Sequence, residues 1–285
     1  MSAERSFGIL ERIIDWAQAN PNVIALVMTG SRAHAHRESV DEFSDYDLEI
    51  IAEDADQLEA SDEWLRSFGH IWVSLSLSEG QAYPTRLIFY EGGVKVDLRL
   101  CTRERITAML DANALDDLYE RGYKVLLDKE GVTSGLPEAS GTPPTTMPPT
   151  RQQFSAVVNE FWFEAAHIPR YLLRDELWVA KTRDWTMKQL LLQMLEWHAI
   201  ARQDRPVDVW HIGTRMKDWA DEKTWRELHA IYSHFDAADS WEGLIATITL
   251  FRRLATEAAT AIGIEYPSGP DTSVSGYIAE LQRRR

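Results

Sequence analysis

Residues 23–52, VIALVMTGSRAHAHRESVDEFSDYDLEIIA, contain the pattern that decides the fold of the first half of the chain. The apolar run over residues 23–28 predicts a buried strand, and the apolar segment over residues 48–52 predicts a second one. Gly30 and Ser31 come directly after the first strand, and a polar loop then leads to Asp45 and Asp47. The stretch therefore predicts two strands of one sheet with polar groups gathered at their ends.

The two aspartates favour a metal site. Asp45 and Asp47 are two residues apart, so in a strand their side chains point to the same face. Two carboxylates on one face repel each other, and burying them unpaired is costly. Mg²⁺ would relieve both effects, because it prefers oxygen ligands and often binds one or two carboxylates together with substrate phosphates. His34 and His36 in the loop are poor ligands for such a hard cation, and we expect them to be solvated.

The Gly30-Ser31 step supplies what a phosphate group needs. Glycine lets the backbone approach an anion closely, and serine offers both a hydroxyl and an N–H group. If a short helix begins at Ser31, its first amides also face the anion. An Asp-x-Asp pair alone is more often a solvated strand end, but the whole combination is typical of enzymes that transfer a phosphorus-centred group.

A third carboxylate, Asp97, lies in the segment GVKVDLRL over residues 93–100, whose alternation predicts a half-buried strand. Asp97 shares one face of this strand with Lys95 and Arg99. Carboxylates from neighbouring strands can converge on one metal. The alternative is that Asp97 forms an ion pair with Lys95 or Arg99 on a solvated face.

These motifs resemble the signature of the polymerase-beta-like nucleotidyltransferases. Longer strings narrow the resemblance to the aminoglycoside 6-adenylyltransferases, also called streptomycin adenylyltransferases, and they occur in order along nearly the whole chain. The strings are MTGSRA, SDYDLEI, VKVDLRL, NEFWFEA, RDELWVAK, QMLEWHA and IEYP.

The resemblance implies Mg²⁺-dependent transfer of AMP from ATP to the 6-hydroxyl of streptomycin, with release of pyrophosphate and inactivation of the antibiotic. It implies that ATP and the aminoglycoside bind between two domains. The residue roles that we expect are these: metal ligands Asp45, Asp47 and Asp97; catalytic base Asp97; nucleotide binding by Gly30, Ser31, Arg32 and Lys181; substrate binding by Glu160, Asp175 and Glu176. Arg215 and Lys217 are weaker candidates for phosphate contacts. For each residue of the second domain taken alone, an exposed helix face with salt bridges is the competing interpretation.

The composition restricts the partners. The chain of 285 residues has a formal net charge of −15, which argues against a nucleic-acid binder and suits a cationic small substrate. Cys101 is the only cysteine, so an intrachain disulfide is impossible, and its position after a strand predicts a small core residue. The sequence shows neither a signal-peptide core nor an apolar run that could span a bilayer. We expect a cytoplasmic monomer that binds no membrane.

The order of elements predicts two domains. Residues 1–135 read as an α/β nucleotidyltransferase domain with a mixed sheet, and residues 136–150 as a proline-rich linker. Residues 151–285 read as an all-α helical bundle that binds substrate. Within these domains we expect a helix that begins at Thr102 as its cap, and a frayed tail after Pro267.

Two other functions stay open on the sequence alone. The same three aspartates would serve a nucleotidyltransferase that modifies a different aminocyclitol or a protein hydroxyl. A nucleotide-binding regulator without turnover would also keep the fold, although intact Gly30, Ser31, Asp45, Asp47 and Asp97 argue against decay of the site.

Overall fold

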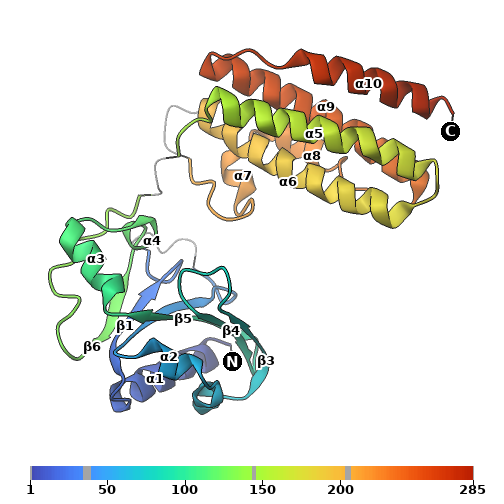
Figure 1. Cartoon of the computed structure of the whole chain (residues 1–285). Coiled ribbons are helices and arrows are strands. Elements are labelled where there is room, and N and C mark those ends of the chain that lie inside the picture. Colours follow the sequence, from blue (N-terminus) through green and yellow to red (C-terminus); the bar gives the residue numbers. More distant parts are fainter. Residues whose placement is uncertain (1, 35–39, 143–145, 203–206, 285) are drawn as a thin grey trace. The chain divides into compact units, whose positions relative to one another are not determined.

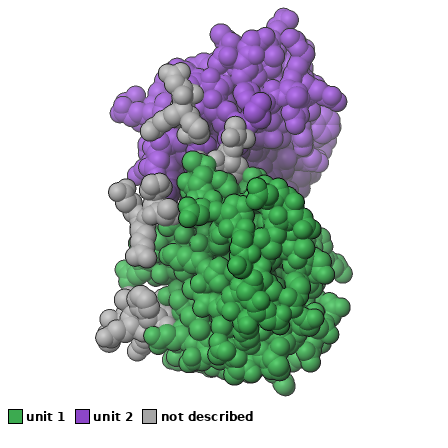
Figure 2. Space-filling model, turned by 90° about the vertical axis from the view of Figure 1, so that its left-hand side faces the viewer, with its two compact units in different colours: residues 1–144 green, residues 145–285 purple. Residues whose placement is uncertain are grey.

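The chain forms two compact units, residues Met1–Pro144 and Thr145–Arg285 (Figure 2). The computed structural model describes residues 2–34, 40–142, 146–202 and 207–284. His36 lies outside these ranges. In the described part of the chain, no helix is both long enough and apolar enough to cross a bilayer.

The first unit is built on a six-stranded sheet in the order β3-β4-β5-β2-β1-β6 (Figure 1). The strands are β1 Val23–Thr29, β2 Tyr46–Ala52, β3 Ile71–Leu77, β4 Thr85–Tyr90, β5 Val94–Thr102 and β6 Lys124–Asp128. β2 and β5 run parallel, whereas the other neighbours are antiparallel. The expected mixed sheet is therefore confirmed.

One face of the sheet carries the larger core of this unit. Tyr46, Leu48 and Ile50 of β2 point to this face, together with the alternate apolar residues of β5. They pack against α1 (Ser2–Ala19), α2 (Ala55–Glu59) and the 3₁₀ helix η2 (Glu63–Phe68). The period-2 pattern of these strands thus buries one complete face.

The opposite face of the sheet is acidic at one end of β2 and β5 and apolar at the other. Beyond Asp47 and Glu49, Ile51 of β2 and Cys101 of β5 enter a smaller core with α3 (Glu104–Ala112) and α4 (Asp117–Glu120). Cys101 is fully buried there, as its sequence context predicts. Asp47 of β2 and Asp97 of β5 occupy the same face at the other end of these strands.

The start of α3 differs from the prediction. β5 extends through Thr102, and Arg103 precedes the helix without a side-chain cap. The prediction of Thr102 as the helix cap is therefore wrong, because strand pairing of Thr102 with Ala52 takes precedence over local capping preference.

The second unit is a helical bundle, which confirms the all-α prediction for this half (Figure 1). Its helices are α5 Arg151–Leu172, α6 Leu177–Arg202, α7 Met216–Trp219, α8 Glu222–Leu228, α9 Ala237–Ile262 and α10 Ser268–Gln282. Thr150 and Gln153 form a reciprocal capping box at the start of α5. The core lies between α5, α6 and α9, where Phe161 stacks on Phe251 with ring centroids 3.5 Å apart.

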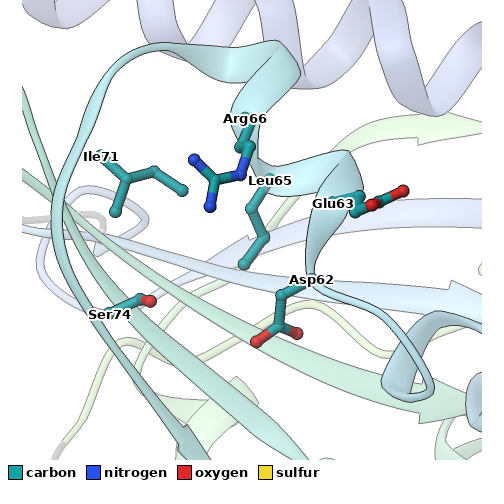
Figure 3. Close-up of a pocket in the computed structure, with 6 residues that line it drawn as sticks. All are labelled: Asp62, Glu63, Leu65, Arg66, Ile71 and Ser74. Atoms are coloured by element: carbon teal, nitrogen blue, oxygen red, sulfur yellow. The ribbon is translucent and has the colours of Figure 1, made fainter.

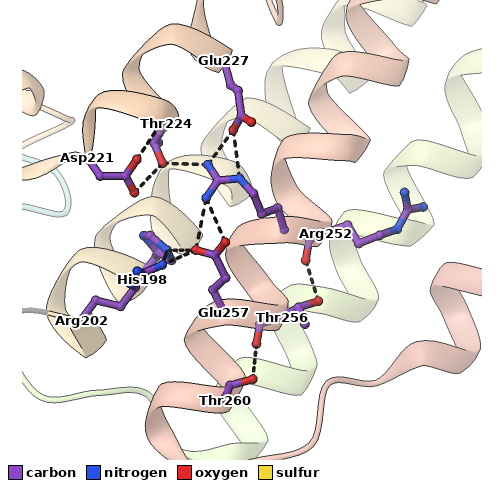
Figure 4. Close-up of polar contacts among 10 residues, drawn as sticks. His198, Arg202, Asp221, Thr224, Glu227, Arg252, Thr256, Glu257 and Thr260 are labelled. Atoms are coloured by element: carbon purple, nitrogen blue, oxygen red, sulfur yellow. Dashed lines mark hydrogen bonds and ion pairs between the residues drawn. The ribbon is translucent and has the colours of Figure 1, made fainter.

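A polar network joins α6, α8 and α9 at one side of the bundle (Figure 4). Glu257 of α9 accepts hydrogen bonds from His198 (2.7 Å) and Arg202 (2.5 Å) of α6. Arg253, one turn earlier on α9, donates to Glu227 and Thr224 of α8. These contacts hold the short helix α8, which could not stay folded on its own.

The expected frayed tail is instead the helix α10. Its segment contains Gly269 and Gly276, which disfavour a helix, so the local prediction is wrong for a tertiary reason. Asp271 forms a bidentate ion pair with Arg252 of α9, and both atom pairs are 2.7 Å apart. Ile278 and Leu281 are buried in the bundle core.

Candidate active site

The turn after β1 needs a glycine because it touches a carboxylate. Gly30 has φ +65°, and a Cβ atom at this position would lie 1.9 Å from Oδ2 of Asp47. Any other residue would displace the Asp47 side chain and strain the backbone. Residues 31–34 form a turn, closed by a hydrogen bond from Ala33 N–H to the Gly30 carbonyl at 3.0 Å. The helix that we considered at Ser31 is therefore absent, and the amides of a turn remain beside Asp47.

Arg32 contacts the end of the loop that precedes β2. Its guanidinium donates to the carbonyls of Ser44 and Asp45 and lies 4.2 Å from the centre of the Tyr46 ring. The Lys124 ammonium in turn donates to the Arg32 carbonyl at 2.6 Å. In this structure Arg32 thus fastens the loop end that delivers Asp45 to the sheet.

The three aspartates are gathered at one end of β2 and β5. Asp47 and Asp97 face each other in the parallel register, and Asp45 directly precedes β2. Lys95 joins the group, because its ammonium lies 2.5 Å from Oδ2 of Asp45 and 3.0 Å from Oδ2 of Asp97. Of the two ion-pair partners considered for Asp97, Lys95 is the one found.

The electrostatics of this group follow from burial and crowding. Burial first, then the charges of Asp97 and Asp45, raise the pKa of Asp47 to about 6. Burial also raises the pKa of Asp97, although hydrogen bonding to Lys95 opposes it. Burial lowers the pKa of Lys95, but its bonds to Asp45 and Asp97 outweigh this effect and leave the pKa raised. The cluster therefore favours an added cation.

The donor set suits a hard divalent cation. All three groups are carboxylates, and Oδ1 of Asp97 is a buried acceptor for which the described residues provide no hydrogen-bond partner. Among the residues that the structure describes, no group of three or more acidic, histidine or cysteine side chains is arranged so that it could hold a metal ion. The Lys95 ammonium provides the positive charge between Asp45 and Asp97 in this arrangement.

Sequence reasoning missed a buried ionic hub one step further along the same face. Glu49, only 1% exposed, accepts hydrogen bonds from Arg99 (2.8 Å), Arg105 (3.1 Å) and the Tyr119 hydroxyl (2.8 Å). Asp116 binds the other side of Arg105 at 2.6 Å. The only local signal was a charged residue inside an apolar strand, since the partners from α3 and α4 are 56 and 70 residues away.

A pocket of the first unit lies away from the carboxylates. It is lined by residues of η2 and β3 and the residue preceding η2, as Figure 3 shows: Asp62, Glu63, Leu65, Arg66, Ile71 and Ser74. Ser74 is paired with Ile88, and Ile88 with Val96, so these side chains share the face opposite to Asp97. The pocket and the aspartates are therefore on different faces of the sheet.

The candidate residues of the second unit occupy its surface and a turn. Glu160 is exposed on α5, and Asp175 and Glu176 are exposed in the connection to α6, with Asp175 at φ +57°. Lys181 on α6 donates to the carbonyl and the hydroxyl of Ser233, at 2.9 and 2.6 Å. The buried acid on α5 is Glu164, which binds Arg183 at 2.9 Å and was not singled out from sequence.

The weaker candidates lie near the short helix α7. Arg215 precedes it with φ +53° and makes no side-chain cap. The Lys217 ammonium lies 5.0 Å from the centre of the Trp225 ring, a cation–π distance.

Comparison with known proteins identifies related sequences over almost the whole chain. The family model described as streptomycin adenylyltransferase matches residues 4–281. The aminoglycoside 6-adenylyltransferase of Campylobacter jejuni is 23% identical over 284 residues, which cover 97% of this chain and 95% of that protein. The aminoglycoside 6-adenylyltransferase of Bacillus subtilis is 24% identical over 268 residues, covering 91% and 92%. A crystal structure of a Bacillus subtilis aminoglycoside 6-adenyltransferase aligns over 96% of this chain and 97% of its own, with 22% identity and a TM-score of 0.48.

Proposed function

Because the chain belongs to the streptomycin adenylyltransferase family, we propose that it transfers the adenylyl group of ATP to a hydroxyl group of an aminoglycoside. Streptomycin, modified at its 6-hydroxyl, is the acceptor that we propose first, and pyrophosphate is the other product. The observation that carries the proposal is the cluster of Asp47 and Asp97 side by side, with the Gly30 turn pressed against Asp47.

Each group of the cluster has a role in this reaction. The backbone of Gly30 and Ser31 binds the phosphate chain, which can approach closely because Gly30 has no side chain. Asp45 and Asp47 would hold Mg²⁺, which when bound would neutralise phosphate charge and orient the phosphate oxygens. Lys95 balances the carboxylate charge and keeps Asp97 in place through its 3.0 Å contact.

Asp97 has two possible roles, as metal ligand and as the base that accepts the proton of the attacking hydroxyl. Its raised pKa, caused mainly by burial, moves the carboxylate toward the range in which a base works at neutral pH. We favour the base, because Asp45 and Asp47 already supply two carboxylates. Replacing Asp97 with Asn should then lower the single-turnover rate by about 10²–10⁴-fold while leaving the affinity for Mg-ATP within about twofold. Rescue of the rate by added Mg²⁺ or Mn²⁺ would instead assign Asp97 to the metal.

The proposed activity is tested by following ATP consumption and pyrophosphate release with a panel of aminoglycosides, and by mass spectrometry of the products. We expect a product that carries one adenylyl group with streptomycin, and none after chelation of divalent metal. Asp47→Asn should abolish the transfer, whereas Glu11→Gln, an exposed carboxylate on α1, should leave it unchanged.

The outcomes separate the competing functions. If only another aminocyclitol or a protein is adenylylated, the reaction type is as proposed but the acceptor is not streptomycin. If the protein binds ATP but forms no product with any acceptor, the proposed activity is rejected and the protein is a nucleotide-binding regulator.

A further inference from the structure

The sheet face that carries the aspartates continues, beyond them, into an exposed apolar surface. Asp97 of β5 is paired with Leu87 of β4, and Leu87 is paired with Leu75 of β3. Residues paired directly across strands share a face, so Asp47, Asp97, Leu87 and Leu75 form one row across the sheet. The row runs from the catalytic cluster to the open edge of the sheet.

The apolar part of this face is unusually open for a sheet. We call it the β3–β4 apolar face, and it consists of Val73, Leu75, Leu77, Leu87 and Phe89. Leu75 is 57% exposed, Val73 53% and Phe89 40%. A contiguous exposed apolar patch usually marks a binding surface in a water-soluble unit, because leaving it in water is unfavourable.

The direction of the reaction indicates what this face binds. Gly30 lies at the end of β1, on the opposite side of Asp47 and Asp97 from β4 and β3. In phosphoryl and nucleotidyl transfer the attacking and leaving oxygens are roughly in line through the phosphorus atom. If pyrophosphate leaves over the Gly30 turn, the attacking hydroxyl must come from the side of β4 and β3.

We propose that the β3–β4 apolar face is the platform for the acceptor, and that it contacts the C–H faces of the aminoglycoside rings. The inference rests on the proposed function and adds a binding surface to it. Ring hydroxyl and amino groups at the rim of the acceptor then meet the acidic cluster, while the flat apolar faces of the rings cover Leu75 and Leu87. In this binding mode one ring hydroxyl lies at Asp97, and the rings exclude water from the space beside that hydroxyl.

Two adjacent residues of β3 provide a matched pair for the test. Leu75 lies on the proposed platform, whereas the exposed neighbour Ser74 points to the opposite face. Leu75→Lys and Ser74→Lys add the same charge to the same strand. We expect Leu75→Lys to raise the KM for the aminoglycoside about fivefold or more, because it places a cation against a cationic substrate. We expect Ser74→Lys to change that KM less than twofold, and both variants to keep the KM for ATP.

A binding measurement on the full chain gives an answer that does not depend on turnover. With ¹³C-labelled methyl groups, titration of streptomycin should shift the NMR signals of Val73, Leu75 and Leu87. The buried methyls of Ile88 and Leu98 on the opposite face should shift much less. With ¹⁵N labelling of the same chain, titration with a non-hydrolysable Mg-ATP analogue should instead perturb the backbone amide signals of Gly30 and Ser31.

The results distinguish failure of the proposed function from failure of the platform alone. If the wild-type protein neither binds nor modifies any aminoglycoside, the proposed function is rejected and the platform with it. If the protein modifies an aminoglycoside but both lysine variants behave alike, only the platform is rejected. If the methyl signals shift with protein concentration and not with aminoglycoside concentration, the face mediates self-association. That result would also reject the platform proposal.

Discussion

At the scale of single residues, Gly30 connects backbone geometry to the chemistry of the cluster. Gly30→Ala would place a Cβ atom within 1.9 Å of Oδ2 of Asp47, so either the carboxylate or the turn has to move. We expect the transfer rate to fall by about 10²-fold or more, in line with small displacements of positioned groups. Gly80→Ala is the matched control, because Gly80 also has positive φ (+73°) but has no atom within 4 Å of the added Cβ. Equal losses of rate in the two variants would show that backbone strain, and not contact with Asp47, is responsible.

Asp47 gives a prediction for stability that is separate from catalysis. Its pKa in the folded protein is raised to about 6 from 3.8, so folding disfavours its ionised form. The metal-free wild type should therefore lose stability as the pH rises from about 4 through about 6, by about 1–3 kcal/mol. Asp47→Asn removes this cost. In the presence of a chelator it should melt at a higher temperature than wild type at pH 8, with the difference vanishing near pH 3.5.

The direction of the change in melting temperature tests whether the ionised Asp47 destabilises the metal-free protein. If Asp47→Asn lowered the melting temperature equally at both pH values, Asp47 would be a stabilising structural acid instead. Mg²⁺ should narrow the difference at pH 8, because it stabilises only the protein that keeps its ligand.

At the scale of secondary-structure elements, the Glu49 hub ties β2 and β5 to α3 and α4. Glu49→Gln would remove the buried carboxylate that pairs with the buried Arg105 guanidinium and would leave Asp116 as the acidic partner of Arg105. Removing one side of a buried ion pair typically costs about 3–5 kcal/mol. Glu53→Gln is the control, since Glu53 is 66% exposed in its pair with Arg103. Exposed pairs contribute about 0–1 kcal/mol. Calorimetric melts of both variants should therefore differ clearly; a Glu49→Gln melt like that of Glu53→Gln would show that the hub contributes little.

The elements also differ in how well they could be predicted from the sequence. The strands around Gly30, Asp47 and Asp97 could be predicted because their hydrophobic periods and turn residues are local signals. Glu49 could not be assigned a role, because its partners Arg105 and Tyr119 come from distant helices. The helix α10 was missed for the same kind of reason: its glycines oppose a helix, and the ion pair of Asp271 with Arg252 is visible only in the folded bundle. The openness of β3 was equally hidden, since its alternating sequence is that of a half-buried strand.

At the scale of the whole molecule, the dominant property is the excess of acidic groups. The chain contains 45 Asp and Glu residues against 30 Lys and Arg residues. Its acidic candidates for substrate contacts, Glu160, Asp175 and Glu176, are exposed, so water and salt reach them. An aminoglycoside carries several positive charges at neutral pH, and a negative protein attracts it over a distance set by ionic strength.

This attraction should make acceptor binding depend on salt. The Debye length is about 10 Å at 0.1 M salt and about 3 Å at 1 M, so the attraction of exposed carboxylates fades over this range. We expect the Kd for streptomycin, measured by calorimetry, to rise steadily between the two concentrations. The Kd for Mg-ATP should not rise in parallel, because the acidic surface repels the nucleotide and salt weakens that repulsion as well. Sucrose at matched osmolarity controls for changes in water activity and should leave both values unchanged. If the affinity for streptomycin does not respond to salt, the protein recognises streptomycin through apolar contacts and neutral hydrogen bonds alone. The acidic surface would then make no contribution to substrate binding.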